Sequence, residues 1–531
     1  MPDLDTDNDR AARWKGFCDR FLRYPALGIS LDYSRIKFDD GFFDALGPLC
    51  DSAFGDMDAL ERGDPVNTDE NRMVGHYWLR NAELAPEPLR AGIEGAIVEA
   101  EAFSSAIHGG TVRAANNEPF RNLLCVGIGG SALGPQLLRH ALVDHDAPLR
   151  TWFLDNTDPD GIARVLAEIG DGLPSTLTVV TSKSGGTPET RNGLLEVADA
   201  YKARGIDFSK HAVAVTGIGS QLDTKAANDG WLMRFPMEDW VGGRTSILST
   251  VGLIPAALQG IAIRDLLKGA AAMDRRTREK DVFSNLSMLL ALSWYSTGKG
   301  KGLKDMVILP YKDRLELFGR YLQQLIMESL GKELDRDGVQ VHQGIAVYGN
   351  KGSTDQHAYV QQLRDGIDNF FATFIEVREA AKATGIEVDP GVTSGDYLQG
   401  FLRGTRAALW DGGRQSLTLS IPRVDARSMG ALIAAFERAV SFYASLVNIN
   451  AYHQPGVEAG KRAAADFIEL MSQVRNGLKP GQATSASDLA TSIGVEAESV
   501  FHILTHLAAN DPKVSVKEGD GPESDRFTLS A

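Results

Sequence analysis

The sequence has few cysteines and lacks the segments that direct a chain into or across a membrane. Its 531 residues include three cysteines, which are far apart and odd in number, at positions 18, 50 and 125. They offer no disulfide framework and no paired zinc-ligand spacing. The N-terminus is acidic, without the basic and then apolar order of a signal peptide. The uncharged stretch over residues 245–263 contains Pro255 and polar residues, which predicts a buried helix and not a membrane span. We therefore expect a cytoplasmic protein.

Basic residues are also in short supply. Lys and Arg number 55 against 70 Asp and Glu, which gives a net charge of −15. This balance argues against general binding to nucleic acid or to anionic membranes, because the average surface repels both. The hydrophobic share of 43% and charged share of 24% are those of a globular protein. The length predicts three or four domains, or two large domains with an appendage.

The hydrophobic pattern predicts helix and loop over residues 1–105 and then two α/β domains, over residues 106–270 and 281–470. In the N-terminal segment, four residues lie at helical spacing: Trp14, Phe17, Phe21 and Leu22. The first domain has four short β-rich runs: Leu123–Ile128, Thr151–Leu154, Leu177–Thr181 and Ala212–Thr216. The second has strands at Met306–Leu309, Ile345–Tyr348 and Leu417–Ile421, with helices at Leu315–Leu330 and Met429–Leu446. This rhythm predicts two doubly wound α/β domains with parallel sheets, whose ligands bind at the carboxyl ends of the strands.

The C-terminal residues 476–531 form a different unit. A Pro/Gly/Ser/Thr-rich linker precedes two predicted helices, Asp488–Ile493 and Glu496–Leu507, and a predicted β-hairpin, Val514–Val516 with Phe527–Leu529. That order is typical of a winged helix. However, residues 481–531 contain eight acidic and three basic residues, so we expect a packing or assembly role and no DNA binding.

Two loops after predicted strands are candidates for binding an anion. The first, Gly127-Ile-Gly-Gly-Ser131, opens a helix, where glycines admit a ligand close to the backbone and free N–H groups favour negative charge. Its spacing is not that of a dinucleotide fingerprint, and it lacks a Walker-type ending. Alone, such a turn is structural at least as often as functional.

The second loop, Thr181-Ser-Lys-Ser-Gly-Gly-Thr187, supplies four hydroxyls, one ammonium and two glycines in seven residues. Thr187 is a predicted N-cap and Pro188 suits the first helical position, so the donors lie at the positive end of a helix. Hydroxyls and N–H groups can surround phosphate oxygens while Lys183 supplies charge. The loop therefore predicts a phosphomonoester site, and the alternative is a capped helix behind a polar turn.

Arg244 and Glu328 are candidates for chemistry on the bound molecule. Arg244 follows two glycines and can reach into a crevice as an oxyanion partner, or it can form a surface salt bridge. Glu328 lies late in an otherwise apolar helix, and burial would raise its pKa, as a general base for a carbon acid requires. A pair with Lys332 on the helix surface is an equally good interpretation.

Two further residues carry weak signals. His357 lies at a loop-to-helix junction, where an imidazole can exchange protons near neutral pH, although most single histidines do not. Lys461 follows the turn that begins with Gln454-Pro-Gly, and most lysines in such places are solvated.

Together, in this order, the motifs resemble the glucose-6-phosphate isomerase (phosphoglucose isomerase) family, whose members contain two sugar-isomerase (SIS) domains of three-layer αβα type. The resemblance covers about residues 106–465. Six motifs carry it: Gly-Gly-Ser131, Ser182-Lys-Ser184, Gly-Gly-Arg244-Thr-Ser, Met-Glu328-Ser, Gly-Ser-Thr-Asp-Gln-His357 and Gln454-Pro-Gly-Val-Glu-Ala-Gly-Lys461. Two positions depart from the family pattern, because Gly186 replaces a common hydroxyl residue and Leu330 a common Asn.

The resemblance implies a role for each residue. It assigns substrate binding to Gly130, Ser131, Ser182, Lys183, Ser184, Thr187, Glu189, Gln324 and Gln454. Glu328 would move a proton between carbons 2 and 1, and Arg244 would stabilise the enediol intermediate. His357 and Lys461 would open and close the sugar ring, with the histidine supplied by the neighbouring subunit. The family uses no cofactor or metal, and its members are cytoplasmic and usually homodimeric, with shared active sites.

The expected activity is thus the reversible isomerisation of glucose 6-phosphate and fructose 6-phosphate in glycolysis and gluconeogenesis. The expected partner is a small sugar phosphate, with no nucleic acid and no membrane. A broader isomerase that also accepts mannose 6-phosphate is one alternative. A sugar-phosphate-sensing regulator is another, but sensing needs the phosphate loop and no proton-transfer residues such as Glu328, His357 and Lys461.

Overall fold

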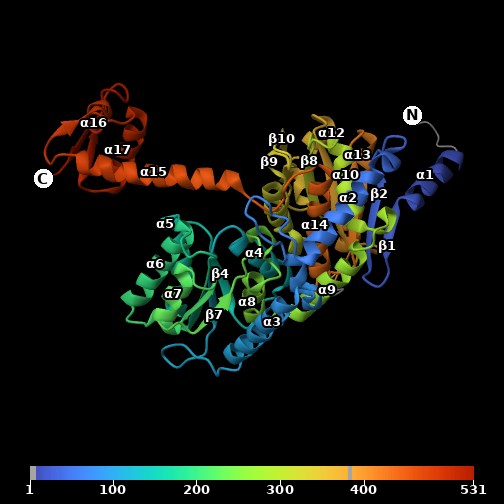
Figure 1. The fold of residues 1–531 in the computed structure, drawn as a ribbon, viewed down its shortest axis with the longest axis horizontal. Coiled ribbons are helices and arrows are strands. Elements are labelled where there is room, and N and C mark those ends of the chain that lie inside the picture. Colours follow the sequence, from blue (N-terminus) through green and yellow to red (C-terminus); the bar gives the residue numbers. More distant parts are fainter. Residues whose placement is uncertain (1–6, 381–384, 531) are drawn as a thin grey trace. The chain divides into compact units, whose positions relative to one another are not determined.

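The computed structural model describes residues 7–380 and 385–530, and the chain divides into two compact units after His453. The first unit contains the two large sheets with their helices, and the second contains one long helix and a small α/β module (Figure 1). The long helix α15 (Pro455–Gly477) crosses the boundary predicted near residue 475 and belongs to the second unit.

The first sheet is parallel, in the order β4-β3-β5-β6-β7. Its strands are β3 (Asn122–Val126), β4 (Arg150–Leu154), β5 (Thr176–Thr181), β6 (Ala212–Thr216) and β7 (Met233–Pro236). Helices α4 (Gly130–Leu142), α5 (Pro159–Ile169), α6 (Pro188–Ala203) and α7 (Gln221–Asn228) follow the first four of these strands. Strands β5 and β6 are buried along their whole length, as expected for parallel strands covered on both faces. The predicted α/β rhythm is confirmed here.

The second sheet has the order β1-β2-β15-β12-β8-β11. Four strands are parallel: β8 (Asp305–Pro310), β11 (Val347–Tyr348), β12 (Phe370–Val377) and β15 (Ser416–Ile421). Strands β2 (Ile29–Arg35) and β1 (Phe21–Tyr24) extend it in antiparallel fashion. The sequence predicted helix and loop for this N-terminal segment, whereas α1 (Asp7–Asp19) ends before Phe21 and Leu22, which lie in β1. The alternation of apolar and polar residues in β2 is the strand signal.

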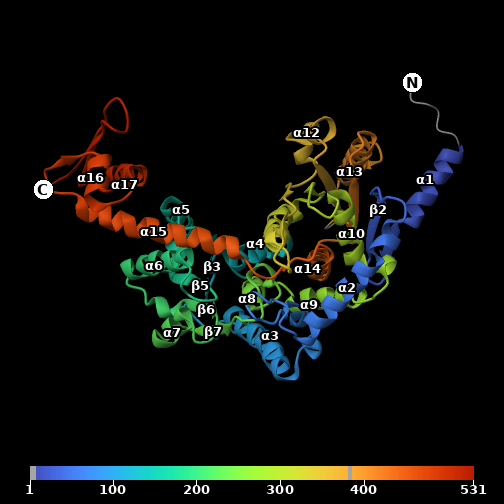
Figure 2. The ribbon, with the colours of Figure 1, turned by 45° about the horizontal axis from the view of Figure 1, so that its top comes forward.

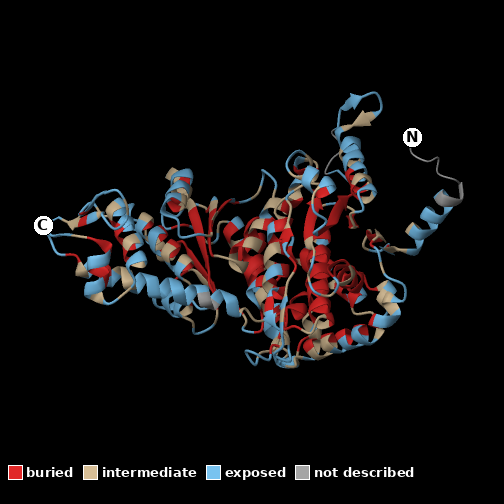
Figure 3. Ribbon diagram, turned by 90° about the horizontal axis from the view of Figure 1, so that it is seen from above, coloured by how far each residue is buried: buried red, intermediate tan, exposed pale blue. Residues whose placement is uncertain are grey.

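The first unit contains further helices, which pack against elements of both sheets. They are α2 (Phe42–Arg62), α3 (Glu87–His108), α8 (Thr250–Leu258), α9 (Ile263–Thr277), α10 (Leu286–Gly298), α11 (Phe318–Leu322), α12 (Val360–Asp365), α13 (Ser394–Asp411) and α14 (Ala426–Leu446). Every residue of α8 is buried, which confirms the buried helix predicted there. Helices α9 and α14 touch through glycines, because a Cβ on Gly269 would lie 1.9 Å from the carbonyl oxygen of Arg427. In Figure 3, buried residues line the strands and the helices between them. No helix in the described ranges is long and apolar enough to cross a bilayer.

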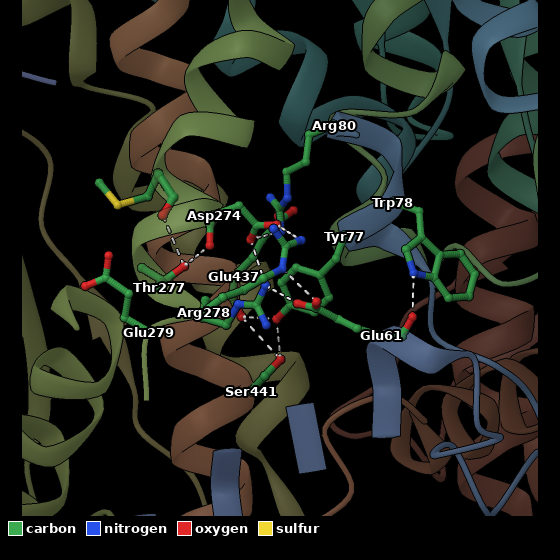
Figure 4. Close-up of polar contacts among 12 residues, drawn as sticks. Glu61, Tyr77, Trp78, Arg80, Asp274, Thr277, Arg278, Glu279, Glu437 and Ser441 are labelled. Atoms are coloured by element: carbon green, nitrogen blue, oxygen red, sulfur yellow. Dashed lines mark hydrogen bonds and ion pairs between the residues drawn. The ribbon is translucent and has the colours of Figure 1, made fainter. Parts of the chain in front are cut away.

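A buried network of charges joins α9, α14 and the turn η1 (His76–Arg80), as Figure 4 shows. Three arginines, Arg80, Arg278 and Arg438, face three carboxylates, Glu61, Asp274 and Glu437. Arg80 Nη1 donates to Glu437 Oε2 at 2.6 Å, and Arg438 Nη2 donates to Asp274 Oδ1 at 2.8 Å. The formal charges cancel, which a buried ionic cluster requires.

The second unit has its own small core. Its elements after α15 are β16 (Ala483–Thr484), α16 (Ala486–Ile493), α17 (Ala497–Asn510), β17 (Val514–Lys517) and β18 (Arg526–Leu529) (Figure 2). The strands form an antiparallel sheet in the order β16-β18-β17. Buried Val474, Leu489, Ile503 and Phe527 pack together. The predicted order of two helices and a hairpin is confirmed, and the likeness to a winged helix stays a prediction.

Candidate active site

Arg244 and Glu328, which the sequence placed 84 residues apart, face each other in the first unit. Arg244 lies on the turn η5 (Gly243–Thr245), and Glu328 ends the π-helical segment η8 (Gln323–Glu328) that continues α11. Arg244 Nη2 is 3.6 Å from Glu328 Oε1 and donates to the carbonyl of His453 at 3.1 Å. The Arg244 side chain is 5% exposed, so it is not a surface salt bridge. Burial lowers the pKa of Arg244, and the charge of Glu328 opposes this.

One nitrogen of this arginine is left without a partner. Among the described residues nothing accepts a hydrogen bond from Arg244 Nη1, although the atom is buried. Buried donors are normally paired, so an unpaired one in a polar crevice marks a place for a ligand or water. The π-helical segment is consistent with this, because π-turns are frequent at functional sites.

The glycine loop before α4 lies directly against the Arg244 turn. A Cβ on Gly130 would lie 2.0 Å from the carbonyl oxygen of Gly243, so only glycine allows this approach. On the other side, a Cβ on Gly129 would lie 3.4 Å from Gln324 Nε2. The structure therefore brings the loop of Gly130 and Ser131 together with Gln324 and Arg244.

The loop between β5 and α6 is held in shape by its own hydroxyls. Ser182 Oγ accepts a hydrogen bond from Gly185 N at 3.1 Å, and Ser184 Oγ accepts one from Gly186 N at 3.1 Å. Gly185 has a φ of +76°, and a Cβ there would lie 2.4 Å from the backbone nitrogen of Leu222. The side chain of Thr187 at the N-cap position forms no capping hydrogen bond, contrary to the predicted cap. The first N–H groups of α6 therefore receive no cap from Thr187 and, like its hydroxyl, remain able to donate hydrogen bonds to a ligand.

Lys183 ties this loop to the Arg244 turn. Its Nζ donates to the carbonyl oxygen of Asp239 at 2.8 Å and lies 3.0 Å from the Asp239 carboxylate. A longer contact of 3.4 Å joins it to the carbonyl oxygen of Val241. Burial lowers the pKa of Lys183, against the opposing effect of Asp239. The carboxylate of Asp239 is 74% exposed, so it is a weak competitor for a bound anion. Glu189 lies half-buried in the first turn of α6.

Lys332 belongs to the site, although the sequence gave it no role beyond a surface pair. It begins the short strand β9 (Lys332–Leu334), which pairs with β10 (Gln340–Gln343). Its Nζ donates to the backbone carbonyl of Glu328 at 2.8 Å, and the residue is 5% exposed. The interpretation as a surface pair of side chains is therefore wrong, because the lysine is buried and bonds to the backbone. Nothing in the sequence pattern separates this lysine from a solvated one.

Three predicted site residues belong to other segments of the chain. His357 ends the turn η9 (Thr354–His357) and is exposed, on a loop that Asp355 holds by accepting hydrogen bonds from Asn350 N at 2.8 Å and Lys351 N at 3.1 Å. Gln454 precedes α15 and Lys461 lies within that helix, in the second unit. Their part in the site stays a prediction.

A small cavity lies behind Arg244. Its volume is about 30 Å³, and its lining includes His76, Trp240, Arg244, Ser329 and Tyr452. Among the described residues, neither buried ring nitrogen of His76 has a hydrogen-bond partner. Such a volume holds ordered water and is too small for a sugar phosphate. Over the described residues, no group of three or more His, Cys, Asp or Glu side chains could hold a metal ion.

The chain is similar to known proteins along nearly its whole length. The model of the phosphoglucose isomerase family matches residues 32–392 and 402–491. A glucose-6-phosphate isomerase of Rippkaea orientalis is 56% identical over 529 residues, which cover 98% of this chain and 100% of the relative. The enzyme of that name from Geobacter sulfurreducens is 55% identical over 96% of this chain and 97% of the relative. A crystal structure of a glucose-6-phosphate isomerase from Chlamydia trachomatis superposes with a TM-score of 0.77 at 27% identity, covering 86% of this chain and 91% of that one.

Proposed function

The chain belongs to the phosphoglucose isomerase family and interconverts glucose 6-phosphate and fructose 6-phosphate, and we propose that Glu328 and Arg244 carry out the proton transfer. One observation supports this assignment most directly. The carboxylate of Glu328 lies 3.6 Å from a buried guanidinium group whose other terminal nitrogen has no partner among the described residues. The reaction is a step of glycolysis and gluconeogenesis throughout this family.

The chemistry of an aldose–ketose isomerisation matches this pair. In the open-chain sugar, a base takes the proton from carbon 2 and returns it to carbon 1, and negative charge collects on the neighbouring oxygens of the enediol. Glu328 takes and returns the proton. Arg244 donates hydrogen bonds to the charged oxygen from a buried position, where such a contact is stronger than in water and needs little reorganisation.

The loop over residues 182–187 would hold the phosphate group. Ser182, Ser184 and Thr187 supply hydroxyls, and the N-terminus of α6 supplies N–H groups and a positive dipole. Lys183 would exchange Asp239 for the phosphate, since a dianion offers a stronger partner than one exposed carboxylate. Binding energy from this end of the sugar holds carbons 1 and 2 in register with Glu328.

The sugar itself would lie along the glycine loop. Gly130 lies against the turn that carries Arg244, and Gly129 lies beside Gln324, which supports the assignment of Gly130, Ser131 and Gln324 to sugar binding. Glu189 has a supporting role at the start of α6. The family motif implies that Gln454 also binds the phosphate. These assignments rest on family membership and on the contacts that join the loop, η5 and η8.

His357 and Lys461 would open and close the sugar ring as an acid–base pair. We infer that the protein is a cytoplasmic homodimer in which His357 serves the site of the neighbouring subunit. The exposure of His357, on a loop that Asp355 keeps in a fixed shape, supports a role toward another chain. Family membership favours this enzyme over a sugar-phosphate-sensing regulator, and activity toward mannose 6-phosphate is a matter for product analysis.

The test of the base is Glu328→Gln, with Glu333→Gln as its matched control. Glu333 lies five residues further along and is exposed, so the same chemical change there leaves the site untouched. We expect Glu328→Gln to lower kcat at least about 10²-fold, the usual contribution of a general base, while the KM for fructose 6-phosphate changes little. The assay is the formation of glucose 6-phosphate without added metal. Near-normal turnover of Glu328→Gln would exclude Glu328 as the base.

A further inference from the structure

Lys332 is a buried cation next to the catalytic carboxylate, and the reaction described above does not use it. Its ammonium group forms one protein hydrogen bond, to the carbonyl oxygen of Glu328 at 2.8 Å. No carboxylate of the described residues forms an ion pair with it, whereas the buried arginines of the α9–α14 network each have at least one. Burying a cation without a carboxylate partner costs free energy, and lysines are almost never fully buried unless paired.

The electrical surroundings of Lys332 are those of the active site itself. The groups that face it are Arg244 on η5, Glu328 on η8, Asp69 in the loop after α2, and His453 after α14. Burial, and then the charge of Arg244, lower the pKa of Lys332 to about 7, while Glu328 and Asp69 act in the opposite direction. Burial lowers the pKa of His453, the charge of Asp69 opposes this, and Lys332 adds a smaller lowering effect. The cluster therefore places two basic side chains, Arg244 and Lys332, beside the carboxylate of Glu328.

The hydrogen bond of Lys332 acts on the backbone that carries Glu328. In a π-helical segment the hydrogen bonds run over five residues, and the carbonyl groups at its end are satisfied poorly within the helix. Lys332 satisfies the carbonyl of Glu328 and so fixes the direction in which this residue leaves the segment. Met or Leu would fill the same buried space without a charge to desolvate, which means that packing alone does not explain a lysine here.

We propose that Lys332 is a positioning residue for Glu328: its side-chain nitrogen holds the end of the π-helical segment by donating a hydrogen bond to the carbonyl oxygen of Glu328. Placing the carboxylate correctly is worth orders of magnitude in rate, since a displacement of about 1 Å can cost 10²-fold. This inference rests on the assignment of Glu328 as the base.

The test compares Lys332→Met with Lys304→Met. Lys304 is also largely buried, with 16% of its side chain exposed, but it pairs with the carboxylate of Asp368 at 2.7 Å. We expect Lys332→Met to lower kcat at least about ten-fold, with the KM for fructose 6-phosphate within about three-fold of wild type. Its midpoint of urea denaturation stays the same or rises, because a desolvated charge has gone. Lys304→Met should give the opposite pattern, with unchanged kcat and a lower midpoint.

The pH dependence of stability supplies a readout that a simple packing role would not move. Between about pH 7 and 10.5 the unfolded lysine binds a proton that the folded one has lost. Stability therefore rises with pH across this window, and Lys332→Met should remove that part of the rise. The expected result is a smaller increase in the urea midpoint from pH 7 to pH 9 in Lys332→Met than in wild type.

Three outcomes are decisive. A kcat of Lys332→Met within about two-fold of wild type would overturn the proposal. A lower kcat together with a lower urea midpoint would also overturn it, because the lysine would then be needed for folding and not for the position of Glu328. Glu328→Gln is measured in parallel: if it stays active, the base assignment fails, and if it is inactive while Lys332→Met is normal, the role of Lys332 alone fails.

Discussion

The buried network between η1, α9 and α14 makes a quantitative prediction about stability. Asp274 accepts a hydrogen bond from Arg438 Nη2 at 2.8 Å, lies 3.4 Å from Arg80 Nη2, and also contacts Arg278. These three arginines lower its pKa although the carboxylate is buried. In Asp274→Asn, which keeps the shape of the side chain, three cations would face two carboxylates.

The magnitude follows from the burial of the partners. The side chains of Asp274, Arg80 and Arg438 are each at most 1% exposed, so solvent cannot screen the charge left over. Removing one partner of a buried ion pair costs about 3–5 kcal/mol, most of which is the penalty of the uncompensated charge. With an m-value of about 3 kcal/mol/M or more, the urea midpoint of the first unit should fall by roughly 1 M.

The assay is urea denaturation followed by circular dichroism, with Asp265→Asn as the control. Asp265 lies on the same helix α9 and pairs with Lys268 at 3.2 Å, but the two side chains are 56% and 69% exposed. The control should lose less than about 1 kcal/mol. The double variant Asp274→Asn/Arg438→Met removes one charge of each sign. We expect it to lose less free energy of unfolding than the two single variants lose together. A loss below about 1 kcal/mol in Asp274→Asn would refute the reasoning, since the network would then be solvated or redundant.

Two further predictions concern the site. Gly186→Ser should lower the KM for fructose 6-phosphate about two- to five-fold, because a Cβ there meets no atom closer than 3.5 Å and the hydroxyl adds a donor to the phosphate loop. Gly185→Ser should raise the KM at least about ten-fold, because Gly185 has a φ of +76° and its Cβ would lie 2.4 Å from Leu222 N. Equal effects of the two substitutions on the KM would contradict this account. The second prediction tests whether His357 serves the neighbouring subunit. An equal mixture of the inactive variants Glu328→Gln and His357→Ala, unfolded and refolded together, should regain about a quarter of wild-type activity, because half of the dimers then contain one intact site. If no activity returns, Glu328 and His357 of one site belong to the same chain.

The sequence predicted the parallel strands well because each is a short apolar run that precedes a turn and a helix. Two parallel strands were missed, β7 and β12. All residues of β12 from Phe370 to Val377 are buried, but no glycine-rich loop draws attention to it. Strands β1 and β2 were missed for another reason. They precede the first sheet in the chain, but β2 pairs with β15, nearly 400 residues later, and β1 extends the sheet beyond β2. Local spacing carries no information about such a distant partner.

The candidate site divides in the same way. Residues in loops with restrictive chemistry were predictable, because Gly130 and Gly185 admit no side chain and the hydroxyls around Lys183 form a recognisable set. Lys332 was not predictable, since its role depends on burial and on a contact with the backbone of Glu328 that composition cannot show. The four-residue spacing of Glu328 and Lys332 suggested a pair of side chains on a helix surface, which is wrong. Side chains four apart are neighbours only on a regular α-helix. Here the π-helical segment η8 ends at Glu328, and Lys332 begins strand β9.

The buried basic residues of this acidic protein fall into two groups, which differ in how closely carboxylates pair with them. In the network of Figure 4, each arginine has a carboxylate oxygen within hydrogen-bond distance, and three cations balance three anions, so no charge remains for a ligand. At the site, Arg244 lies 3.6 Å from its carboxylate and Lys332 has only a carbonyl oxygen. Arg244 Nη1, which has no partner among the described residues, can therefore donate a hydrogen bond to an anion that binds beside Glu328. A chain with a net charge of −15 can therefore bind a dianionic sugar phosphate, because attraction over a few ångströms in a buried site outweighs a screened surface average.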